Sequence, residues 1–575
     1  MSLRDPQIPV LSKGYGRLKG RAVRRRNFLV ATLLSDYAKT MLGPKGMYKM
    51  LMDSQGEVIV TKDGKVMMEK IEAKHPVARM LKEAAKAQDV EVGDGTKTAI
   101  ILTGAFLKEA DKLLERKIHP TIIIDGYGKA VTKAFEALEK TVTGVSIDDD
   151  DLLRNIAETV IGGRFDEDSK EHLSNLVVKA IKQIFDQESG NVNVDHIDCR
   201  KKAGGSLRDS ELIQGLIIYK ERSHPNMPKR IENAKIALVT KALEISRKTT
   251  EVAREYVIED PKQLTAFKEA EDTFMKEIAR KIRGAGTDIL FCRKRISDSM
   301  MAFFAEERVL AFELTGEDDM ERLAEAVGAE VISDVNDIKE SDLGWAGLAE
   351  FRKVAGDEML FLEGCRDPKA LTILIRGGNI HVVDEVERVV RDAAKTISVA
   401  IKGDGIVPGG GASELEMASA IRRSLRRIGG KEQLALEAFA NAVESIPEAL
   451  IKNAGLDPID FLTALRTEHV RGKKAVGINV FDNAIMDMEE VGIVEACEVK
   501  KHALKLAYEV AESILRIDDM IAVTRRGEIE REEERKVMAR ERIQQEKVRR
   551  ALEKEEELKD IDRSLMERMK HPETM

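Results

Sequence analysis

Three glycine-containing turns in the first hundred residues have the composition of phosphate-binding loops. They are Gly43-Pro44-Lys45-Gly46, Asp63-Gly64 and Gly93-Asp94-Gly95-Thr96, which we expect to follow a helix, follow a strand and open a helix, respectively. Glycines let backbone N–H groups approach phosphate oxygens, a helix N-terminus favours negative charge, and Asp94 could hold Mg²⁺ against the phosphates. Each turn alone is weak evidence, because a Gly-Asp-Gly before a helix is more often an ordinary capped loop.

Two familiar nucleotide motifs do not match. A Walker P-loop needs a glycine directly before the lysine and another glycine five residues upstream of that one. Lys97-Thr98 is instead preceded by Thr96, and Gly409-Gly410-Gly411 has no G-x-G-x-x-G continuation. The turns therefore belong to neither a P-loop nor a Rossmann fingerprint.

Bulk composition narrows the class of protein. The chain has 575 residues, 43% hydrophobic and 34% charged, with a net charge of −8. This length suggests about three domains. The charge argues against a general nucleic-acid binder, which carries a basic excess. No apolar run is long enough to span a membrane, and the polar segment from Met1 to Pro9 does not resemble a signal peptide.

The cysteines and histidines point to no disulfide framework and no metal cluster. Four cysteines are scattered without C-x-x-C spacing, and nine histidines are dispersed along the chain. We interpret the cysteines as reduced thiols of a cytoplasmic protein.

The elements that must position the turns are mostly helices in the first third of the chain. Apolar spacing predicts helices ending near Leu42 and running over about 75–88, a short strand at 58–60, and a long helix that Thr96 can cap. From about 235 to 378 apolar β-type runs alternate with helices, and long helices return at about 382–401 and 412–453. This order predicts a middle α/β domain inserted into a helical one.

Two further segments have distinctive patterns. Residues 261–283 carry Leu264, Phe267, Phe274, Ile278 and Ile282 at the spacing of an amphipathic helix. Residues 525–575 mix Glu, Arg and Lys with sparse apolar positions, which favours a solvated helix or disorder over a weak coiled coil.

Taken in order, the motifs closely resemble the group II chaperonins, the thermosome family of archaea and its eukaryotic cytosolic relatives. The resemblance covers about residues 9–523. The segments that carry it are Met41 to Gly46, Val60 to Gly64, Gly93 to Thr98, His224 to Ile231, Ile375 to Gly378, Gly409 to Ala412, Asn453 to Pro458 and Leu515 to Asp519.

The resemblance implies a multidomain α+β chaperonin fold. It has a helical equatorial domain (1–147 and 405–524), a small intermediate domain (148–217 and 370–404) and an inserted α/β apical domain (218–369), followed by a charged helical or disordered tail (525–575). A helical protrusion at about 243–283 would act as a built-in lid and help to hold non-native client proteins, whose exposed apolar surface is the recognition signal.

The resemblance also assigns cofactors, partners and a site. It implies ATP and Mg²⁺, and assembly with itself or paralogous subunits in a double ring of roughly 16–18 in the cytoplasm, without nucleic acid or membrane. Asp94 would hold Mg²⁺, while Asp63 and Asp392 would position and activate the attacking water. The nucleotide-binding residues would be Leu42, Gly43, Pro44, Lys62, Gly93, Asp94, Gly95, Thr96, Lys97, Thr98, Arg164, Gly410, Gly411, Asn479 and Glu495.

The residues around Asp392 do not by themselves assign it a role. It falls outside the apolar stripe of its helix, so it can face a cleft, but by itself it would be interpreted as an exposed helical aspartate. The stripe consists of Val382, Val386, Val390, Ala393 and Ile397. The resemblance reverses that interpretation.

Several positions depart from the family pattern. Lys62-Asp63-Gly64-Lys65 stands where Asn-Asp-Gly-Ala is usual, although a lysine before the aspartate is usual in the bacterial-type (group I) chaperonins. Thr96-Lys97-Thr98 replaces three threonines, and Arg164 replaces a nucleotide-sensing lysine. The tail also lacks the Gly-Gly-Met repeats common in archaeal members. At position 164, the arginine keeps the positive charge of the usual lysine but has a planar, forked head group.

These departures leave alternatives open. Lys97 could reach the phosphates, which we favour, or turn to solvent. The leading hypothesis is an active ATPase chaperonin, and the alternative is a chaperonin-like structural subunit that hydrolyses nucleotide poorly or not at all. A metabolic kinase would need a small-substrate site that the sequence does not reveal.

Overall fold

A computed structural model describes residues 15–52, 56, 58–71, 73, 75–244, 261–367 and 369–523. Its contacts divide the chain into two units, one of residues 1–27 with 514–575 and one of residues 28–513. The tail predicted at 525–575 lies outside the described residues, as do positions 245–260 of the predicted lid. No helix among the described residues is long and apolar enough to cross a membrane.

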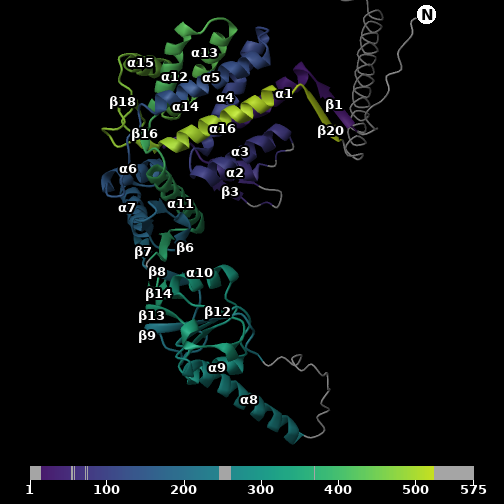
Figure 1. Ribbon diagram of the computed structural model, residues 1–575, viewed down its shortest axis with the longest axis vertical. Helices are drawn as coiled ribbons and strands as arrows, with labels where there is room; N and C mark the ends of the chain where they lie inside the picture. Colours follow the sequence, from purple (N-terminus) through teal and green to yellow (C-terminus); the bar gives the residue numbers. More distant parts are fainter. Residues whose placement is uncertain are drawn as a thin grey trace, which may run out of the picture. The chain divides into compact units, whose positions relative to one another are not determined.

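The smaller unit contains an antiparallel pair of strands from opposite ends of the chain. Strand β1 (Tyr15–Lys19) pairs with β20 (Asp519–Val523). The register runs from Tyr15 opposite Val523 to Lys19 opposite Asp519. Helix α1 (Arg21–Lys39) begins directly after β1, and α16 (Cys497–Leu515) ends shortly before β20 (Figure 1).

Packed helices form the part of the larger unit that holds the three turns. They are α2 (Gly64–Lys70), α3 (Pro76–Val92), α4 (Thr96–Glu115), α5 (Pro120–Leu138), α12 (Ala412–Ser424), α13 (Lys431–Val443), α14 (Ser445–Asn453) and α15 (Pro458–Val470). Helix α4 is buried on nearly all sides of its first three turns, as expected of a central helix. Phe106 of α4 stacks on Phe439 of α13 with ring centroids 4.4 Å apart, and Tyr127 of α5 donates a hydrogen bond to the Phe106 carbonyl at 2.9 Å. These contacts fix the helix that begins at the third turn.

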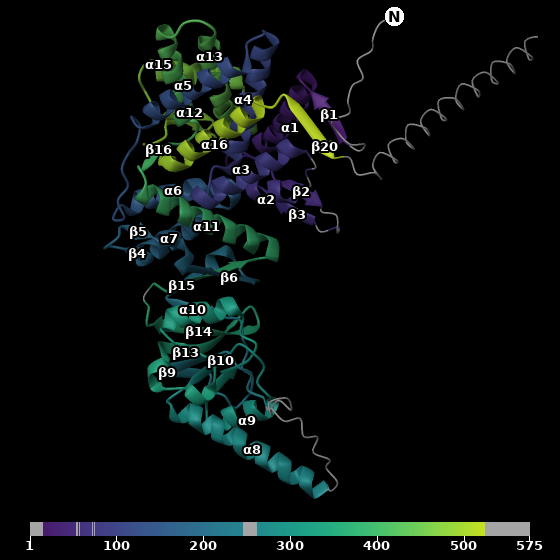
Figure 2. The same cartoon turned by 45° about the vertical axis from the view of Figure 1, so that its right-hand side comes forward.

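Short strands connect these helices. Strands β2 (Lys49–Met52) and β3 (Val58–Thr61) form an antiparallel hairpin before α2 (Figure 2). Strand β16 (Ile406–Pro408) pairs with β19 (Val494–Ala496), and β17 (Val476–Asn479) pairs with β18 (Ala484–Asp487).

A three-stranded sheet has its own helices and core. Strand β15 (Leu371–Gly377) lies between β6 (Ile197–Ala203) and β7 (Glu211–Ile213). Its apolar side chains share a hydrophobic core with α6 (Asp150–Ile161), α7 (Glu167–Ile184) and α11 (Ile380–Lys402). Figure 2 shows these helices beside the sheet. The short strands β4 (Phe185–Asp186) and β5 (Asn191–Val192) pair after α7.

A seven-stranded mixed sheet forms a second, separate core. Its strands are β8 (Gly215–Ile218), β9 (Arg230–Val239), β10 (Ile289–Cys292), β11 (Leu310–Phe312), β12 (Val331–Ile332), β13 (Gly344–Val354) and β14 (Asp357–Cys365). Strand β9 pairs in parallel with β10 and antiparallel with β13. Helices α8 (Pro261–Gly284), α9 (Asp298–Glu306) and α10 (Glu317–Val327) contribute to the same core.

The mixed α+β class and the alternation in the middle of the chain agree with the sequence prediction, and three details differ. Thr96 is the first helical residue of α4, and Gly95 is the N-cap without a side-chain hydrogen bond. The stretch 412–453 is three helices, interrupted near Gly430 and Glu444. Strand β13 lacks a continuous apolar run and was not predicted.

Candidate active site

One cavity of about 380 Å³ collects residues from turns that are far apart in the sequence. Most of the predicted site residues line it: Leu42, Gly43, Pro44, Lys62, Asp94, Gly95, Lys97, Thr98, Arg164, Gly410, Gly411, Asn479 and Glu495. Asp63, Gly93, Thr96 and Asp392 are not among the lining residues, although each belongs to an element at the cavity or next to it.

The first turn follows α1 and needs glycine. Gly43 has φ = 73°, a left-handed conformation that disfavours side chains, and a Cβ there would lie 2.3 Å from Leu450 Cδ2. Asn453 Nδ2 donates to the carbonyls of Lys39 and Leu42, both at 2.8 Å. These bonds hold the end of α1 and place Pro44 at the cavity.

The second turn connects β3 with α2. Asp63 is the N-cap of α2, and its Oδ1 accepts a hydrogen bond from the Val66 amide at 2.9 Å. Its own amide donates to Thr61 Oγ1 at 3.0 Å. The capping bond uses one carboxylate oxygen, so Asp63 has a structural role whatever else it does.

The third turn joins α3 to α4 through two left-handed glycines, Gly93 at φ = 77° and Gly95 at φ = 79°. Asp94 Oδ1 accepts from the Gly95 amide at 2.7 Å, and Gln88 Nε2 donates to the Asp94 carbonyl at 2.8 Å. Because the first residues of a helix lack intrahelical acceptors, the amides at the start of α4 are available to an anion in the cavity.

A second helix begins at the cavity from the other half of the chain. Gly410 and Gly411 have φ of 57° and 78°, and Gly411 is the N-cap of α12 without a side-chain hydrogen bond. A Cβ on Gly410 would lie 2.5 Å from Met488 Sδ and 2.9 Å from the Ile478 carbonyl oxygen. Close packing against Met488 and the β17 backbone, together with the positive φ, therefore requires glycine at position 410.

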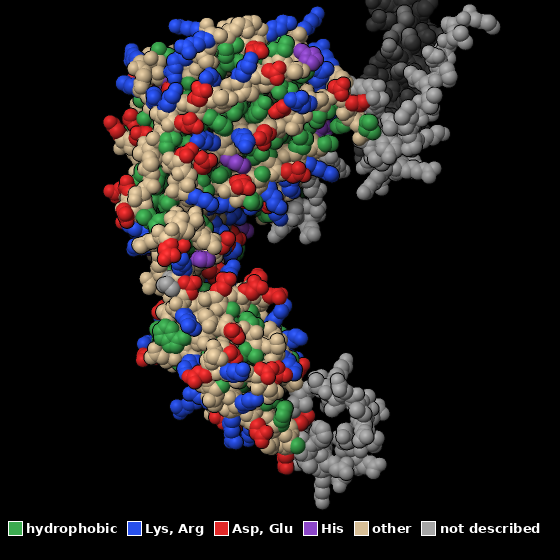
Figure 3. Space-filling model, viewed as in Figure 1, with side chains coloured by type: hydrophobic (Ala, Val, Ile, Leu, Met, Phe, Trp, Pro, Cys, Tyr) green, Lys and Arg blue, Asp and Glu red, His purple; other side chains and the backbone are tan. Residues whose placement is uncertain are grey.

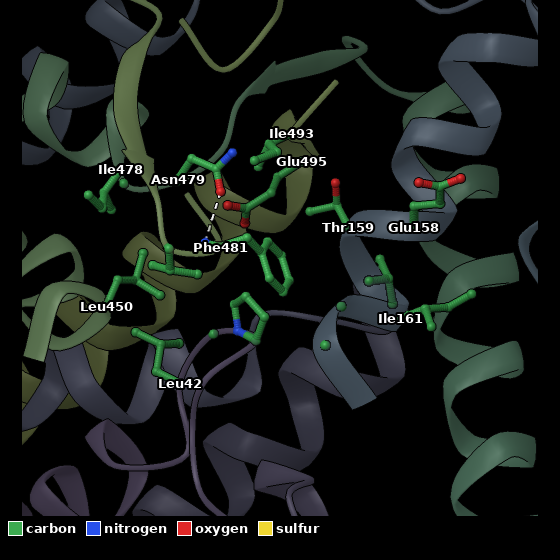
Figure 4. Close-up of a pocket in the computed structure, with 18 of the residues that line it drawn as sticks. Leu42, Glu158, Thr159, Ile161, Leu450, Ile478, Asn479, Phe481, Ile493 and Glu495 are labelled. Carbon is green, nitrogen blue, oxygen red and sulfur yellow. Dashed lines mark hydrogen bonds between the residues drawn. The ribbon is translucent and has the colours of Figure 1, made fainter. Parts of the chain in front are cut away.

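Polar groups at the ends of β17 and β19 form one wall, with the aromatic ring of Phe481 beside them (Figure 4). Asn479 Oδ1 accepts from the Phe481 amide at 3.0 Å. Glu495 Oε2 lies 2.8 Å from Lys500 Nζ, which also contacts Glu414 Oε1 at 2.6 Å. Burial raises the pKa of Glu495, and the neighbouring Lys500 partly opposes that rise.

Helix α6 and the turn after it provide the facing wall. Glu158, Thr159 and Ile161 line the cavity across from Asn479 and Glu495 (Figure 4). Arg164 Nε lies 3.6 Å from Glu385 Oε1 of α11. Within the part of the chain that the structure describes, Arg164 Nη1 is buried and has no hydrogen-bond partner.

Lys62 and Lys97 are lysines at the second and third turns that line the cavity. Lys62 is 3% exposed and its Nζ donates to the Pro44 carbonyl at 2.8 Å. Lys97 Nζ donates to the Lys62 carbonyl at 3.3 Å, so it does not extend freely into solvent. Burial, with smaller contributions from Lys97 and Arg164, lowers the pKa of Lys62 to about 7. Burial and Arg164 also lower the pKa of Lys97.

Asp392 lies in the field of several other acids. Burial raises its pKa well above the usual aspartate value, and the negative charges of Asp63, Asp94 and Asp89 raise it further, while Arg164 opposes the rise. The side chain is thus not the fully exposed helical carboxylate that the residues alone suggested. A carboxylate whose pKa is raised by burial and by like charges is typical of functional sites.

These residues fit a magnesium nucleotide. Arg164 Nη1, which has no partner among the described residues, and the two helix N-termini are suited to phosphate oxygens. Gly162 has open space where a Cβ would stand. The described residues contain no cluster of three His, Cys, Asp or Glu side chains that could hold a metal alone. Asp94 could suffice for Mg²⁺, which typically keeps waters and binds through one or two carboxylates and substrate phosphates.

Some lining residues were missed by sequence reasoning. Asn155, Glu158 and Thr159 of α6 belong to no motif, and Lys170 of α7 and Lys500 of α16 look like ordinary helical lysines in the sequence. The Gly162-Gly163-Arg164 departure was the one sequence signal near that wall.

The comparisons with known proteins agree with the fold. Residues 34–525 match the model of the TCP-1/cpn60 chaperonin family. The chain is 46% identical to a thermosome subunit of Methanopyrus kandleri over 90% of this chain and 95% of that one. It is 45% identical to thermosome subunit alpha of Archaeoglobus fulgidus over 91% and 96%, and 45% identical to a thermosome subunit of Pyrococcus horikoshii over 92% and 95%.

Nothing in these matches favours a subunit that hydrolyses nucleotide poorly or a metabolic kinase. The chain therefore belongs to the TCP-1/cpn60 chaperonin family, and within it is a group II chaperonin of the thermosome type, an ATP-dependent molecular chaperone.

Proposed function

We propose that this chain binds ATP with Mg²⁺ in the cavity, hydrolyses it to ADP and phosphate, and couples the cycle to the folding of non-native proteins. The observation that carries the proposal is that five separate turns meet at one cavity, at Pro44, Lys62, Asp94, Arg164 and Gly410. The buried Arg164 Nη1 without a partner among the described residues supports an anionic ligand there.

Different walls would bind different parts of the nucleotide. The turns at Leu42–Pro44 and Gly93–Thr98, with Lys62 and Arg164, would bind the phosphates through backbone amides and cationic side chains. Gly410 and Gly411 would lie against the nucleotide, with Asn479 and Glu495 near the base and ribose. Mg²⁺, bound through Asp94, would neutralise charge on the phosphates.

Asp63 and Asp392 would position and activate the attacking water. Burial and the neighbouring carboxylates raise the pKa of Asp392, so this carboxylate holds a proton more readily than an ordinary aspartate, which suits a group that takes a proton from water. The capping bond from the Val66 amide to Asp63 Oδ1 fixes the orientation of the second carboxylate.

Turnover and binding together test these roles. Asp392→Ala should leave Mg-ATP affinity nearly unchanged and slow hydrolysis by about 10²–10⁴-fold, because water activation is lost while phosphate contacts remain. Asp384→Ala on the same helix, whose carboxylate contacts Lys201 Nζ at 2.9 Å, is the matched control. Unchanged turnover in Asp392→Ala would remove Asp392 from the mechanism, and a wild-type chain that binds no ATP would overturn the proposed function.

The domain division expected from the resemblance is part of the proposal. The core of the seven-stranded sheet is built from residues between Leu216 and Leu362, which supports an apical domain at 218–369. The core of the three-stranded sheet supports an intermediate domain at 148–217 and 370–404. The remaining residues of 1–147 and 405–524 would form the equatorial domain that binds the nucleotide.

Assembly into a double ring of roughly 16–18 subunits is proposed on the same basis. One face of the β2–β3 hairpin supports it, because Met50, Met52, Val58 and Val60 are 74%, 75%, 45% and 46% exposed. Met50 is opposite Val60, and Met52 is opposite Val58. An apolar face of this kind marks an interaction site in a soluble protein.

The apical helix α8 supports the proposed lid and client contacts only in its described portion. Ile282 and Met275 are buried against the sheet, and Phe274 is 54% exposed. The side chains of Leu264 and Phe267 lie outside the described residues. On the face drawn in Figure 3, Lys and Arg are interspersed with Asp and Glu. A cytoplasmic location without a nucleic-acid or membrane partner is part of the proposal.

A further inference from the structure

Two lysines connect the three phosphate-facing turns. Lys97 at the start of α4 donates from Nζ to the carbonyl of Lys62, and Lys62 donates from Nζ to the carbonyl of Pro44. The third turn is thereby joined to the second, and the second to the first. Both lysines line the cavity, and the stem of Lys97 lies against Gly64, where a Cβ would be 2.8 Å from Lys97 Cγ.

The two ammonium groups can bind a ligand while they hold the turns. An ammonium has three N–H donors, so a bond to one backbone carbonyl leaves others for a phosphate oxygen. Arg164 adds a third cationic side chain to the same lining, with a buried Nη1 that lacks a partner among the described residues.

The position of Lys97 also concerns the metal. Its ammonium is attracted by the carboxylates of Asp94, Asp63 and Asp392, the groups assigned above to Mg²⁺ and to the attacking water. Lys97 and Asp94 line the same cavity, so the protonated lysine would contribute positive charge near the proposed metal ligand. An uncharged threonine at this position would leave the neutralisation of the phosphates to Mg²⁺.

We propose that Lys62 and Lys97 supply from the protein much of the charge neutralisation that Mg²⁺ otherwise brings, so that the cavity binds metal-free ADP nearly as tightly as Mg-ADP. This inference rests on the proposed function. It concerns nucleotide binding only, and Mg²⁺ keeps its role in hydrolysis.

The alternative role for Lys97 is to neutralise the nearby carboxylates, and it predicts a different Mg²⁺ dependence of ADP binding. If the Lys97 ammonium served only as a counter-ion for the three carboxylates, ADP without Mg²⁺ would gain little from it. Removal of Mg²⁺ would then weaken ADP binding strongly in the wild-type chain. The dependence of affinity on Mg²⁺ thus separates the two roles.

The test is calorimetric ADP binding at pH 6.5, with excess Mg²⁺ and with excess EDTA. We expect the wild-type Kd to differ by less than about tenfold between the two conditions. Lys97→Met keeps the stem over Gly64 and removes the charge, so the Kd in EDTA should rise by about ten- to a hundredfold, the range for a hydrogen bond to a charged group. The Kd with Mg²⁺ should rise less.

Two further variants make the test specific. Lys97→Arg keeps the charge and should retain binding in EDTA. Lys112→Thr removes a lysine from the far end of the same helix, where it pairs with Glu109, and should change neither Kd. Positions 97 and 112 are about 22 Å apart along α4. This exceeds the Debye length, so the charge of Lys112 is screened at the cavity.

Each outcome has a defined meaning. A wild-type affinity that falls more than about tenfold in EDTA overturns the inference, and this comparison needs no variant to fold. An equal Mg²⁺ dependence in wild type and Lys97→Met also overturns it. Absence of ADP binding even with Mg²⁺ would instead overturn the proposed function, and this inference with it.

Discussion

The buried Lys62 predicts that nucleotide affinity depends on pH. Burial lowers the pKa of this lysine to about 7, with Lys97 and Arg164 lowering it and Glu385 opposing them. A phosphate anion next to the ammonium should raise that pKa again, because an opposite charge favours the protonated form. The pKa is then higher in the complex than in the free site, so ADP binding takes up a proton above pH 7.

The size of the pH effect on ADP affinity follows from the linkage between protonation of Lys62 and ADP binding. A group with this pKa is half protonated at pH 7 and about 1% protonated at pH 9, so affinity should fall about fivefold at pH 8 and about fiftyfold at pH 9, relative to pH 7. Below pH 7 the ammonium is already charged and affinity should level off. The decline ends where the pH reaches the pKa of the complex.

Calorimetry in two buffers of different ionisation enthalpy measures both the affinity and the proton uptake. With saturating Mg²⁺ we expect uptake of about half a proton per ADP at pH 7 and nearly one at pH 8. Lys62→Met should abolish this component and leave only the titration of Lys97 and of ADP itself. Lys65→Met is the matched control, because its ammonium contacts Asp89 Oδ2 at 2.6 Å and its pKa is raised by that partner.

The reasoning fails if wild type and Lys62→Met show the same pH dependence. It also fails if ADP binding releases protons between pH 7 and 8 in the wild type. The first result would mean that Lys62 does not sense the phosphates, and the second that the ligand disfavours its charge.

Three other predictions concern the backbone, the hairpin and the lid. Gly410→Ala should lower the free energy of unfolding by at least about 1–2 kcal/mol and weaken ADP binding, because φ is 57° and a Cβ would be 2.9 Å from the Ile478 carbonyl. Gly429→Ala is the control, since a Cβ there meets open space. Equal melting temperatures of the two variants would show that an alanine at position 410 is not strained. Met50→Glu with Val60→Glu should give folded but unassembled chains by native mass spectrometry, unlike Ile459→Glu on α15, and an intact ring would exclude the hairpin as an interface. Deletion of residues 247–276 should preserve ATP turnover and assembly but abolish the protease protection gained with a transition-state nucleotide analogue, and full protection would contradict the lid.

The elements predicted well from the sequence are those whose pattern is local. Helix α11 has an apolar stripe along most of its 23 residues, and the runs at Ile289–Cys292 and Leu310–Phe312 are fully buried strands. Strand β13 was missed because its sequence alternates small, charged and apolar residues without a run. It exists because β9 and β14 pair with its two edges, which is non-local information.

The stretch 412–453 was predicted as continuous helix because it is apolar on many faces. Alanine-rich helices buried among neighbours show no polar break in periodicity, so the pattern could not locate where α12, α13 and α14 end. Gly429-Gly430 was the visible interruption, since glycine is unfavourable inside a helix.

The site residues also separate into those with a local sequence signal and those defined by contacts between distant parts of the chain. The glycine turns could be found from the sequence because each carries its own backbone chemistry. The α6 wall could not, since Asn155, Glu158 and Thr159 acquire a role only when α6 packs against β19 and faces β17 across the cavity. Glu495 was inferred by resemblance, but its buried partners Lys500 and Glu414 needed the structure.

Lys62 shows most clearly what the structure adds to the motif. An unfolded lysine has a pKa near 10.5, so a folded-state pKa of about 7 means that placing it here costs about 4 kcal/mol at pH 7. The penalty is complete below pH 7 and shrinks as the pH rises toward 10.5, because only the unfolded chain then holds the proton. The hydrogen bond to the Pro44 carbonyl returns about 1–3 kcal/mol of this. Folding alone would be served better by an uncharged side chain, so the reason for a lysine on this wall lies in what the cavity binds.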